Sequence, residues 1–428
     1  MPDSFAPECL KTIDVLSIIG EGVLSWADMA RPVRFAIHRQ LSQVLITLHQ
    51  ADLGSYAFQE SMFSLNGDLT DGRQVSVNQL RRISVKEDGL IELRPWNCPV
   101  NIGTKRDCFP VKSRYFLTGL YEGDFKVIDG PWQVTLCSSI HAEMSGMVSR
   151  RLRVPMEGCT LKIVAEGKSP DEHESYALDI MLLLALAYGN GVTCHRWLFC
   201  YSDNEHLELW RSRAGEEFGP GPIIESFAVQ HFLEQVLPVW HQMPDADKKV
   251  IKTAVAHLNS SGMGYLDNRL FQVAQTLEFL AMKWIPVAAL PDDEKELRSS
   301  LKKICRDWRK LNPHADPSGK IADRVTKAFD WPVLKRQIEG LAFQSGLDLS
   351  VMGLDLEHLK SARDAVAHSI TLEGVSPSSG PHHELLMCAQ KCVQIILLLK
   401  LKYSGLVRSS ENGWATAKDI SWFLGGCS

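Results

Sequence analysis

An arginine and a histidine five residues apart, Arg363 and His368, are the residues of this sequence best suited to chemistry. A guanidinium carries a fixed positive charge and binds phosphate oxygens in pairs, whereas an imidazole exchanges a proton near neutral pH. The two groups suffice for cleavage of RNA without a metal ion, with the 2′-hydroxyl of the RNA as the nucleophile. DNA lacks that hydroxyl and should resist. Asp364 lies four residues before His368 on the same helical face, where a carboxylate can orient the ring and favour its protonated form.

The spacing alone is weak evidence, because about one Arg-x-x-x-x-His match is expected by chance in a chain of this composition. A second copy does occur, from Arg309 to His314. There Asn312-Pro313 stand before the histidine, and the residue preceding a proline disfavours helical backbone, so that helix should end by about Leu311. We interpret the second copy as a helix end followed by a loop.

The predicted helix around Arg363 gives that residue an unusual position. At about 100° per residue, one apolar stripe contains Leu356, Leu359, Ala362, Val366 and Ile370. Arg363 lies about 40° from Leu359 and therefore within the stripe, where a guanidinium needs an anion, either a carboxylate of the protein or an arriving phosphate. His368 lies about 140° around the helix from Arg363. The two therefore reach one site only if Arg363 extends sideways, if the helix opens near His368, or if a dimer completes the site. The alternative is an ordinary core salt bridge from Arg363 to Glu278 or Glu339, with His368 on the polar face.

Other candidate residues have simpler explanations. Cys194, His195 and Cys200 lack the spacing of a zinc site, and their apolar surroundings favour packing. His382-His383 opens the last predicted helix, and we interpret it as a solvated first turn, with a place near His368 as the alternative. A cationic run can attract RNA phosphates, although a solvated helix face is its commoner explanation; the run contains Lys302, Lys303, Arg306, Arg309 and Lys310.

Composition limits the class of protein. The 428 residues are 45% hydrophobic and 23% charged, as in an ordinary globular protein, and the net charge of −5 excludes a globally basic nucleic-acid binder but not a local basic patch. The sequence lacks the GxxxxGK phosphate loop, the GxGxxG fingerprint, HExxH and GxSxG, which disfavours common nucleotide hydrolases, zinc proteases and serine hydrolases. The 11 cysteines form no CxxC pair, and neither a secretory signal nor an apolar run of the ~20 residues needed to span a bilayer is visible. We therefore expect a cytoplasmic protein with no membrane, metal or cofactor.

Two domains are expected from the chain length and from a change of pattern at Gly219-Pro-Gly-Pro222. The first part, residues 1–220, alternates apolar and polar residues with Asn-Gly and Asp-Gly pairs between them, including Asn66-Gly67, which predicts a β-rich sandwich or barrel-like domain. The second part, residues 223–405, has helical periodicity, and residues 406–428 form a tail too short to interpret. Helices are expected at about 223–241, 246–258, 265–284, 292–310, 318–327, 330–344, 355–370 and 383–404. The fold class is therefore α+β with two domains.

The segment from Leu359 to His368, followed by a short loop and the apolar helix from His383 to Tyr403, resembles the end of HEPN domains (higher eukaryotes and prokaryotes nucleotide-binding). The helix from Tyr265 to Leu280 also looks like the opening helix of HEPN proteins of bacterial abortive-infection systems. The resemblance is limited to about residues 223–405 and does not extend to the first domain.

The resemblance implies an all-helical bundle that forms a homodimer, with two motifs meeting in one composite cleft, and a metal-independent endoribonuclease activity. It assigns Arg363 to phosphate and transition-state binding, Asp364 to the polar position after the arginine, and His368 to catalysis. We accordingly expect a toxin that cleaves RNA in abortive anti-phage defence, with a phage-derived or small-molecule trigger at the β-rich domain. The alternative is a non-catalytic module for dimerisation or for nucleotide or protein binding, in which Arg363 anchors an anion.

Overall fold

The computed structural model describes most of the chain in two compact units. The described residues are 16–40, 43–49, 62–86, 89–96, 98–103, 109–120, 122–138, 157–202, 206–210, 219–262, 264–285, 292–312, 314–315, 334–367, 380–411 and 414–425. Unit 1 comprises residues 1–242 with 405–417, and unit 2 comprises residues 243–404 with 418–428. The boundary expected at residues 219–222 lies within unit 1, and the expected tail is shared between the units. The α+β layout with a β-rich N-terminal part and a helical C-terminal part is confirmed.

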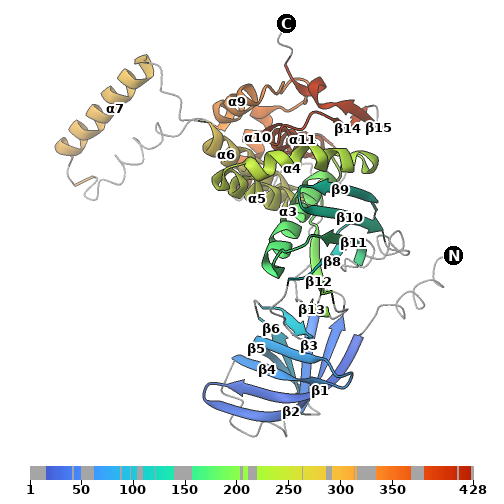
Figure 1. Cartoon of the computed structure of the whole chain (residues 1–428). Coiled ribbons are helices and arrows are strands. Elements are labelled where there is room, and N and C mark those ends of the chain that lie inside the picture. Colours follow the sequence, from blue (N-terminus) through green and yellow to red (C-terminus); the bar gives the residue numbers. More distant parts are fainter. Residues whose placement is uncertain are drawn as a thin grey trace, which may run out of the picture. The chain divides into compact units, whose positions relative to one another are not determined.

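Unit 1 begins with a closed antiparallel barrel of six strands (Figure 1). Its strands are β1 (Leu16–Trp26), β2 (Met29–Gln40), β3 (Gln43–His49), β4 (Met62–Leu69), β5 (Gln74–Val85) and β6 (Leu90–Pro95). They follow the order β4-β1-β2-β3-β6-β5, and pairing of β4 with β5 closes the ring. Alternate residues of these strands point inward and form one apolar core, which includes Ile37, Ile46, Leu65, Leu80 and Leu93. Of the two architectures expected, the barrel is the one observed.

The turn expected at Asn66-Gly67 is wrong, because both residues lie inside β4. Gly67 is paired with Gly22 of β1. A Cβ atom at Gly22 would lie 2.3 Å from the carbonyl oxygen of Asn66, and one at Gly67 would lie 2.5 Å from that of Glu21. The glycines therefore permit close approach of two strands rather than a reversal of the chain.

The barrel continues through β7 (Val100–Ile102) into a second antiparallel part of the sheet, in the order β7-β13-β12-β8-β11-β10-β9. These strands are β8 (Lys112–Thr118), β9 (Phe125–Asp129), β10 (Trp132–Ser138), β11 (Glu157–Val164), β12 (Thr193–Cys200) and β13 (His206–Trp210). Between β11 and β12 runs the largely buried helix α3 (Pro170–Tyr188). Ser169 begins it with a capping box, in which its hydroxyl accepts from the backbone of Glu172 and its own backbone donates to the Glu172 side chain.

The last helix of unit 1, α4 (Val229–Gln242), is preceded by the short helix η3 (Ser226–Ala228) and packs on β9. Near its end His241 Nε2 lies 2.6 Å from Asp129 Oδ2, and the Tyr176 hydroxyl donates to the same oxygen at 2.8 Å. These contacts join α4, α3 and the end of β9.

Unit 2 is helical (Figure 1), and α6 is the helix against which most of its other described helices pack. The helices are α5 (Asp245–Ser260), α6 (Leu266–Trp284), α7 (Asp292–Leu311), α9 (Leu334–Ser345), α10 (Leu356–Ala367) and α11 (Pro381–Lys400). Helix α6 packs against α5, α9, α10 and α11, and its face formed by Leu270, Val273, Leu277 and Leu280 is completely buried. The expected helix at 318–327 lies outside the described residues.

After α11 the chain forms a hairpin, β14 (Leu406–Glu411) and β15 (Trp414–Asp419), and the short helix η4 (Ile420–Phe423). Leu424 forms a β-bridge with Leu347, which follows α9, and Asp348 donates its backbone N–H to the carbonyl of Phe423. The described part of the tail that was too short to interpret therefore forms a hairpin and a short helix. No helix in the described part of the chain combines the length and the apolar character needed to cross a membrane.

Candidate functional site

Helix α10 carries Arg363 and Asp364. Asp355 caps the helix, because its carboxylate accepts hydrogen bonds of 3.0 Å from the backbone N–H groups of Glu357 and His358. Leu359 and Ala362 are buried, and this register leaves Arg363 partly buried, with 25% of its side chain exposed. The sequence placed Arg363 within the apolar stripe, and the structure leaves it half-buried beside these two residues.

The guanidinium of Arg363 is paired with two carboxylates. Its Nη1 donates to Asp364 Oδ1 at 2.8 Å, and its Nη2 lies 3.5 Å from Glu278 Oε2 on α6. Sequence alone named Glu278 and Glu339 as candidate partners, and the structure selects Glu278. Protein carboxylates thus supply the anion that this position needs.

The pairing does not use every donor of the guanidinium. Arginine has five N–H groups, and the Nε atom of Arg363 is buried without an acceptor within hydrogen-bond distance in the described structure. The contact with Glu278 is a long ion pair, and a quarter of the side chain is exposed. Because Nε is buried, a further anion would reach Arg363 through the exposed quarter of its side chain.

The remaining predicted catalytic residue, His368, lies outside the described residues. Asp364 is 41% exposed and accepts from Arg363. Its expected role in orienting His368 stays a prediction.

The second Arg-x-x-x-x-His copy has the predicted form. Helix α7 ends at Leu311, and His314 lies exposed in the turn that follows. This arrangement confirms the interpretation of the copy as a helix end and loop.

A histidine pair lies at the contact of α10 with the start of α11. His358 Nε2 is 3.2 Å from His382 Nδ1, and the ring centroids are 4.9 Å apart. Both rings are half-buried, as is His383, whose Nδ1 is buried without a hydrogen-bond partner in the described structure. Sequence reasoning missed His358, although it lies only five residues before Arg363.

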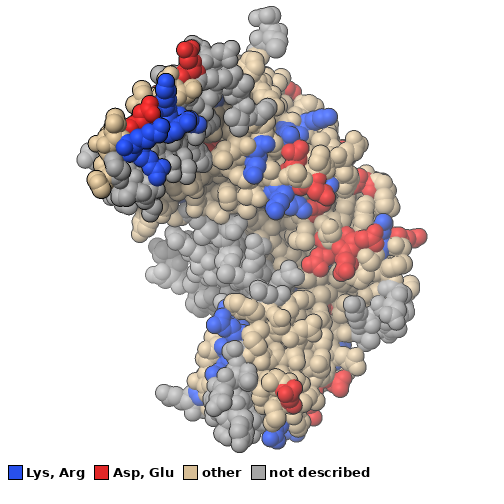
Figure 2. Space-filling model, turned by 90° about the vertical axis from the view of Figure 1, so that its left-hand side faces the viewer, with Lys and Arg blue, Asp and Glu red and all other residues tan. Residues whose placement is uncertain are grey.

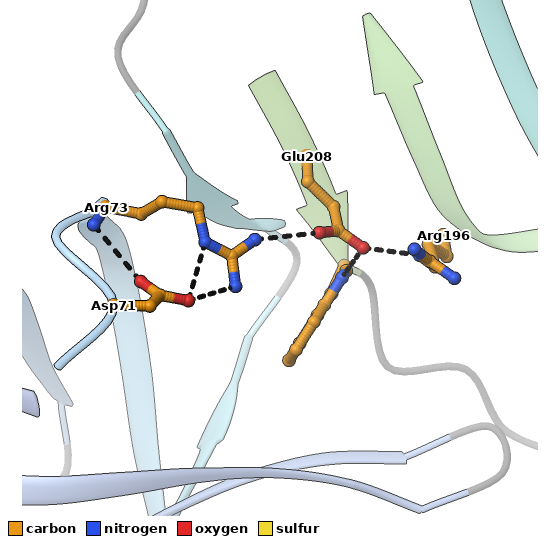
Figure 3. Close-up of polar contacts among 5 residues, drawn as sticks. Asp71, Arg73, Arg196 and Glu208 are labelled. Atoms are coloured by element: carbon orange, nitrogen blue, oxygen red, sulfur yellow. Dashed lines mark hydrogen bonds and ion pairs between the residues drawn. The ribbon is translucent and has the colours of Figure 1, made fainter. Parts of the chain in front are cut away.

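In unit 1, Glu208 is the centre of a charged cluster (Figure 3). Its carboxylate accepts from Arg196 Nε, from Trp210 Nε1 at 2.7 Å and from Arg73 Nη1 at 3.2 Å. Arg73 also donates to Asp71, and this hydrogen bond lowers the pKa of the Asp71 carboxyl. Glu208 is nearly buried with both oxygens engaged, so the cluster joins β12, β13 and the β4–β5 turn rather than offering a reactive group.

Residues that flank Arg73 and Glu208 line a cavity of about 660 Å³ in unit 1. Its walls combine carboxylates, amides and apolar side chains; they include Asn66, Asp68, Gln74, Ser76, Asn101, Asp171, Glu174, Phe199, Leu207 and Leu209. The volume falls in the range of about 300–1,000 Å³ typical of small-molecule sites. No group of three or more His, Cys, Asp and Glu side chains is placed to hold a metal ion among the residues that the structure describes. The side chain of His195 is not among them.

Comparison with known proteins adds no relative: no family model, no curated protein and no solved structure matches this chain.

Proposed function

We propose that this protein is a metal-independent endoribonuclease that cleaves RNA at a site containing Arg363, Asp364 and His368. In this mechanism the 2′-hydroxyl loses its proton to an imidazole, and its oxygen attacks the adjacent phosphorus. The bond to the 5′-oxygen breaks, and the leaving oxygen takes up a proton, which produces a 2′,3′-cyclic phosphate and a 5′-hydroxyl. Arg363 binds the phosphate and stabilises the charge that develops on it.

The observation that supports the proposal is the state of the Arg363 guanidinium. It is held at the edge of the α10 apolar stripe with a buried N–H that has no acceptor in the described structure, five residues before His368. The resemblance of this segment to HEPN domains supports the other parts of the proposal. These are a homodimer with a composite site, and abortive anti-phage defence in the cytoplasm as the setting. The trigger, a phage product or a small molecule, would bind to unit 1, where the 660 Å³ cavity has a suitable volume.

Growth of bacteria that express the protein is the first test. Wild type should arrest growth and leave RNA ends with 2′,3′-cyclic phosphate, whereas Arg363→Ala and His368→Ala should be tolerated. Lys360→Ala, a cation on the same helix, and His314→Ala, the histidine of the second copy, are matched controls and should remain toxic. Chelator should not reduce cleavage by the purified protein. Intact RNA in the wild-type strain, or equal cleavage after His368→Ala, would rule out the proposed activity.

The second candidate function is a non-catalytic module in which Arg363 is a structural or anion-anchoring residue. The ion pair with Glu278 favours it, because two carboxylates already offset the guanidinium charge. This function predicts that expression is tolerated in every variant and that Arg363→Ala mainly lowers stability. Growth and thermal melting of the same variants separate the two candidates.

A further inference from the structure

Helix α7 carries a row of large apolar residues, three of which have exposed side chains. Leu297, Leu301, Ile304, Trp308 and Leu311 recur at alternating intervals of four and three residues. Ile304 is 61% exposed, Trp308 40% and Leu311 81%. Helix α7 packs extensively against no other described helix or strand. We call this row the α7 seam; its spacing is that of the narrow contact stripe of paired helices.

The charges of α7 are segregated along its axis as well. Residues 292–296 contain four carboxylates and one lysine, whereas residues 298–310 contain six cations and one carboxylate. In Figure 2, which views the molecule from the side on which α7 lies in Figure 1, Lys and Arg side chains gather on this helix beside a few carboxylates. One end of the helix is thus acidic and the rest is basic.

We propose that α7 is a self-association element that pairs antiparallel with α7 of a second copy of this chain. If Leu301 of one helix lies opposite Ile304 of the other, Leu297 lies opposite Trp308. The acidic residues 292–296 then lie beside residues 309–313, which begin with Arg309 and Lys310. A parallel pair would place acidic end against acidic end and basic end against basic end, which is unfavourable. A two-fold axis relates the helices of the antiparallel pair, so the assembly closes as a dimer.

Other partners fit α7 less well. RNA would contact the basic face and leave Ile304, Trp308 and Leu311 in water. An anionic lipid surface would repel the acidic first turn, and a helix that lies on a membrane has a broader apolar face than this seam. A second copy covers Leu301, Ile304 and Trp308 and places the acidic first turn of each helix beside Arg309 and Lys310 of the other.

The test is the molar mass of the full-length protein in solution, measured by light scattering. Wild type should have twice the chain mass of 47.9 kDa. Ile304→Glu, and independently Leu311→Glu, should raise the dissociation constant at least tenfold. Ser299→Glu introduces the same residue on the opposite face of α7 and should leave the dimer intact. Circular dichroism of each variant checks that the helices remain folded.

Cysteine cross-linking tests the orientation. In a Cys305→Ser background, chains with Leu297→Cys and chains with Trp308→Cys should form mixed disulfides when combined, because these positions face each other only in the antiparallel pair. Disulfides between two Leu297→Cys chains would overturn that orientation. A monomeric wild type, or a dimer unaffected by both seam variants, would overturn the proposal itself. The inference depends on α7 alone and not on cleavage of RNA, so intact RNA would not count against it; if correct, it supplies the dimer that the proposed site requires.

Discussion

The ion pair between Arg363 and Glu278 should contribute measurably to the stability of unit 2, because it joins α10 to the central helix α6. At the observed 3.5 Å, the Coulomb attraction is about 5 kcal/mol for an effective dielectric constant of 20. Both side chains are only 25% exposed, so desolvation and loss of side-chain freedom offset most of this attraction. We expect about 0.5–1 kcal/mol of net coupling, the upper part of the range for exposed pairs.

A double-mutant cycle measures this coupling directly. Arg363→Ala and Glu278→Gln should each lower the opening free energy of α6 and α10 by about 1–2 kcal/mol, and the double variant should lose less than the sum. Hydrogen exchange of peptides from these two helices, measured at increasing urea, reports on unit 2 separately from unit 1. A parallel cycle on the exposed pair Lys335–Glu357 is the control and should show no measurable coupling.

Additive losses at Arg363 and Glu278 would refute the structural part of this reasoning. That result would mean that Glu278 does not hold the guanidinium in solution, although the two side chains lie within ion-pair distance. A coupling above about 3 kcal/mol would also contradict it, since such values belong to fully buried pairs.

Three further predictions concern unit 1, where urea unfolding is the measurement. Glu208→Gln removes the charge shared by Arg73 and Arg196 and should lower the unfolding free energy by about 1–3 kcal/mol. Burial lowers the pKa of His173 below its usual 6.5, so only the unfolded chain gains a proton as pH falls below that value. Stability should therefore decline below pH 6.5 by at most about 1.4 kcal/mol per pH unit, and His173→Gln should flatten this decline. Ser169→Ala removes the cap of α3 and should cost about 1 kcal/mol, whereas an unchanged midpoint would show that the capping box does not stabilise the helix.

Helices were more predictable than strands in this chain, because helical periodicity is repeated over many residues. Helix α7 was expected at 292–310 and ends one residue later. The Asn66-Gly67 pair was taken for a turn, whereas both residues lie inside β4, where Gly67 permits close approach to Gly22 of β1. The alternation that defines a strand is short, and glycine has more than one role in it.

Contacts between helices could not be predicted from the sequence, because they depend on how the helices pack against one another. The position of Arg363 in its stripe showed that an anion was required, but the choice of Glu278 over Glu339 depends on how α6 and α9 pack around α10. His358 and His382 are separated by 24 residues and meet because α10 and α11 both pack against α6. His368, the expected catalytic residue, could be predicted from the sequence only by its residue type and by its separation of five residues from Arg363.

The two candidate functions predict the same effect of Glu278→Gln on stability but different effects on activity. If Arg363 binds the scissile phosphate, Glu278 competes with that phosphate for the guanidinium, and its neutralisation should lower the KM for RNA while it also lowers stability. If Arg363 is only structural, the same variant loses stability and gains no activity, because no phosphate competes. The glutamine keeps the size and one acceptor of the glutamate, so the comparison isolates the charge. The test compares wild type with Glu278→Gln by the cleavage rates at saturating and limiting RNA and by the melting temperature. A lower KM together with a lower melting temperature would mean that the Arg363 guanidinium both stabilises the fold and binds the substrate.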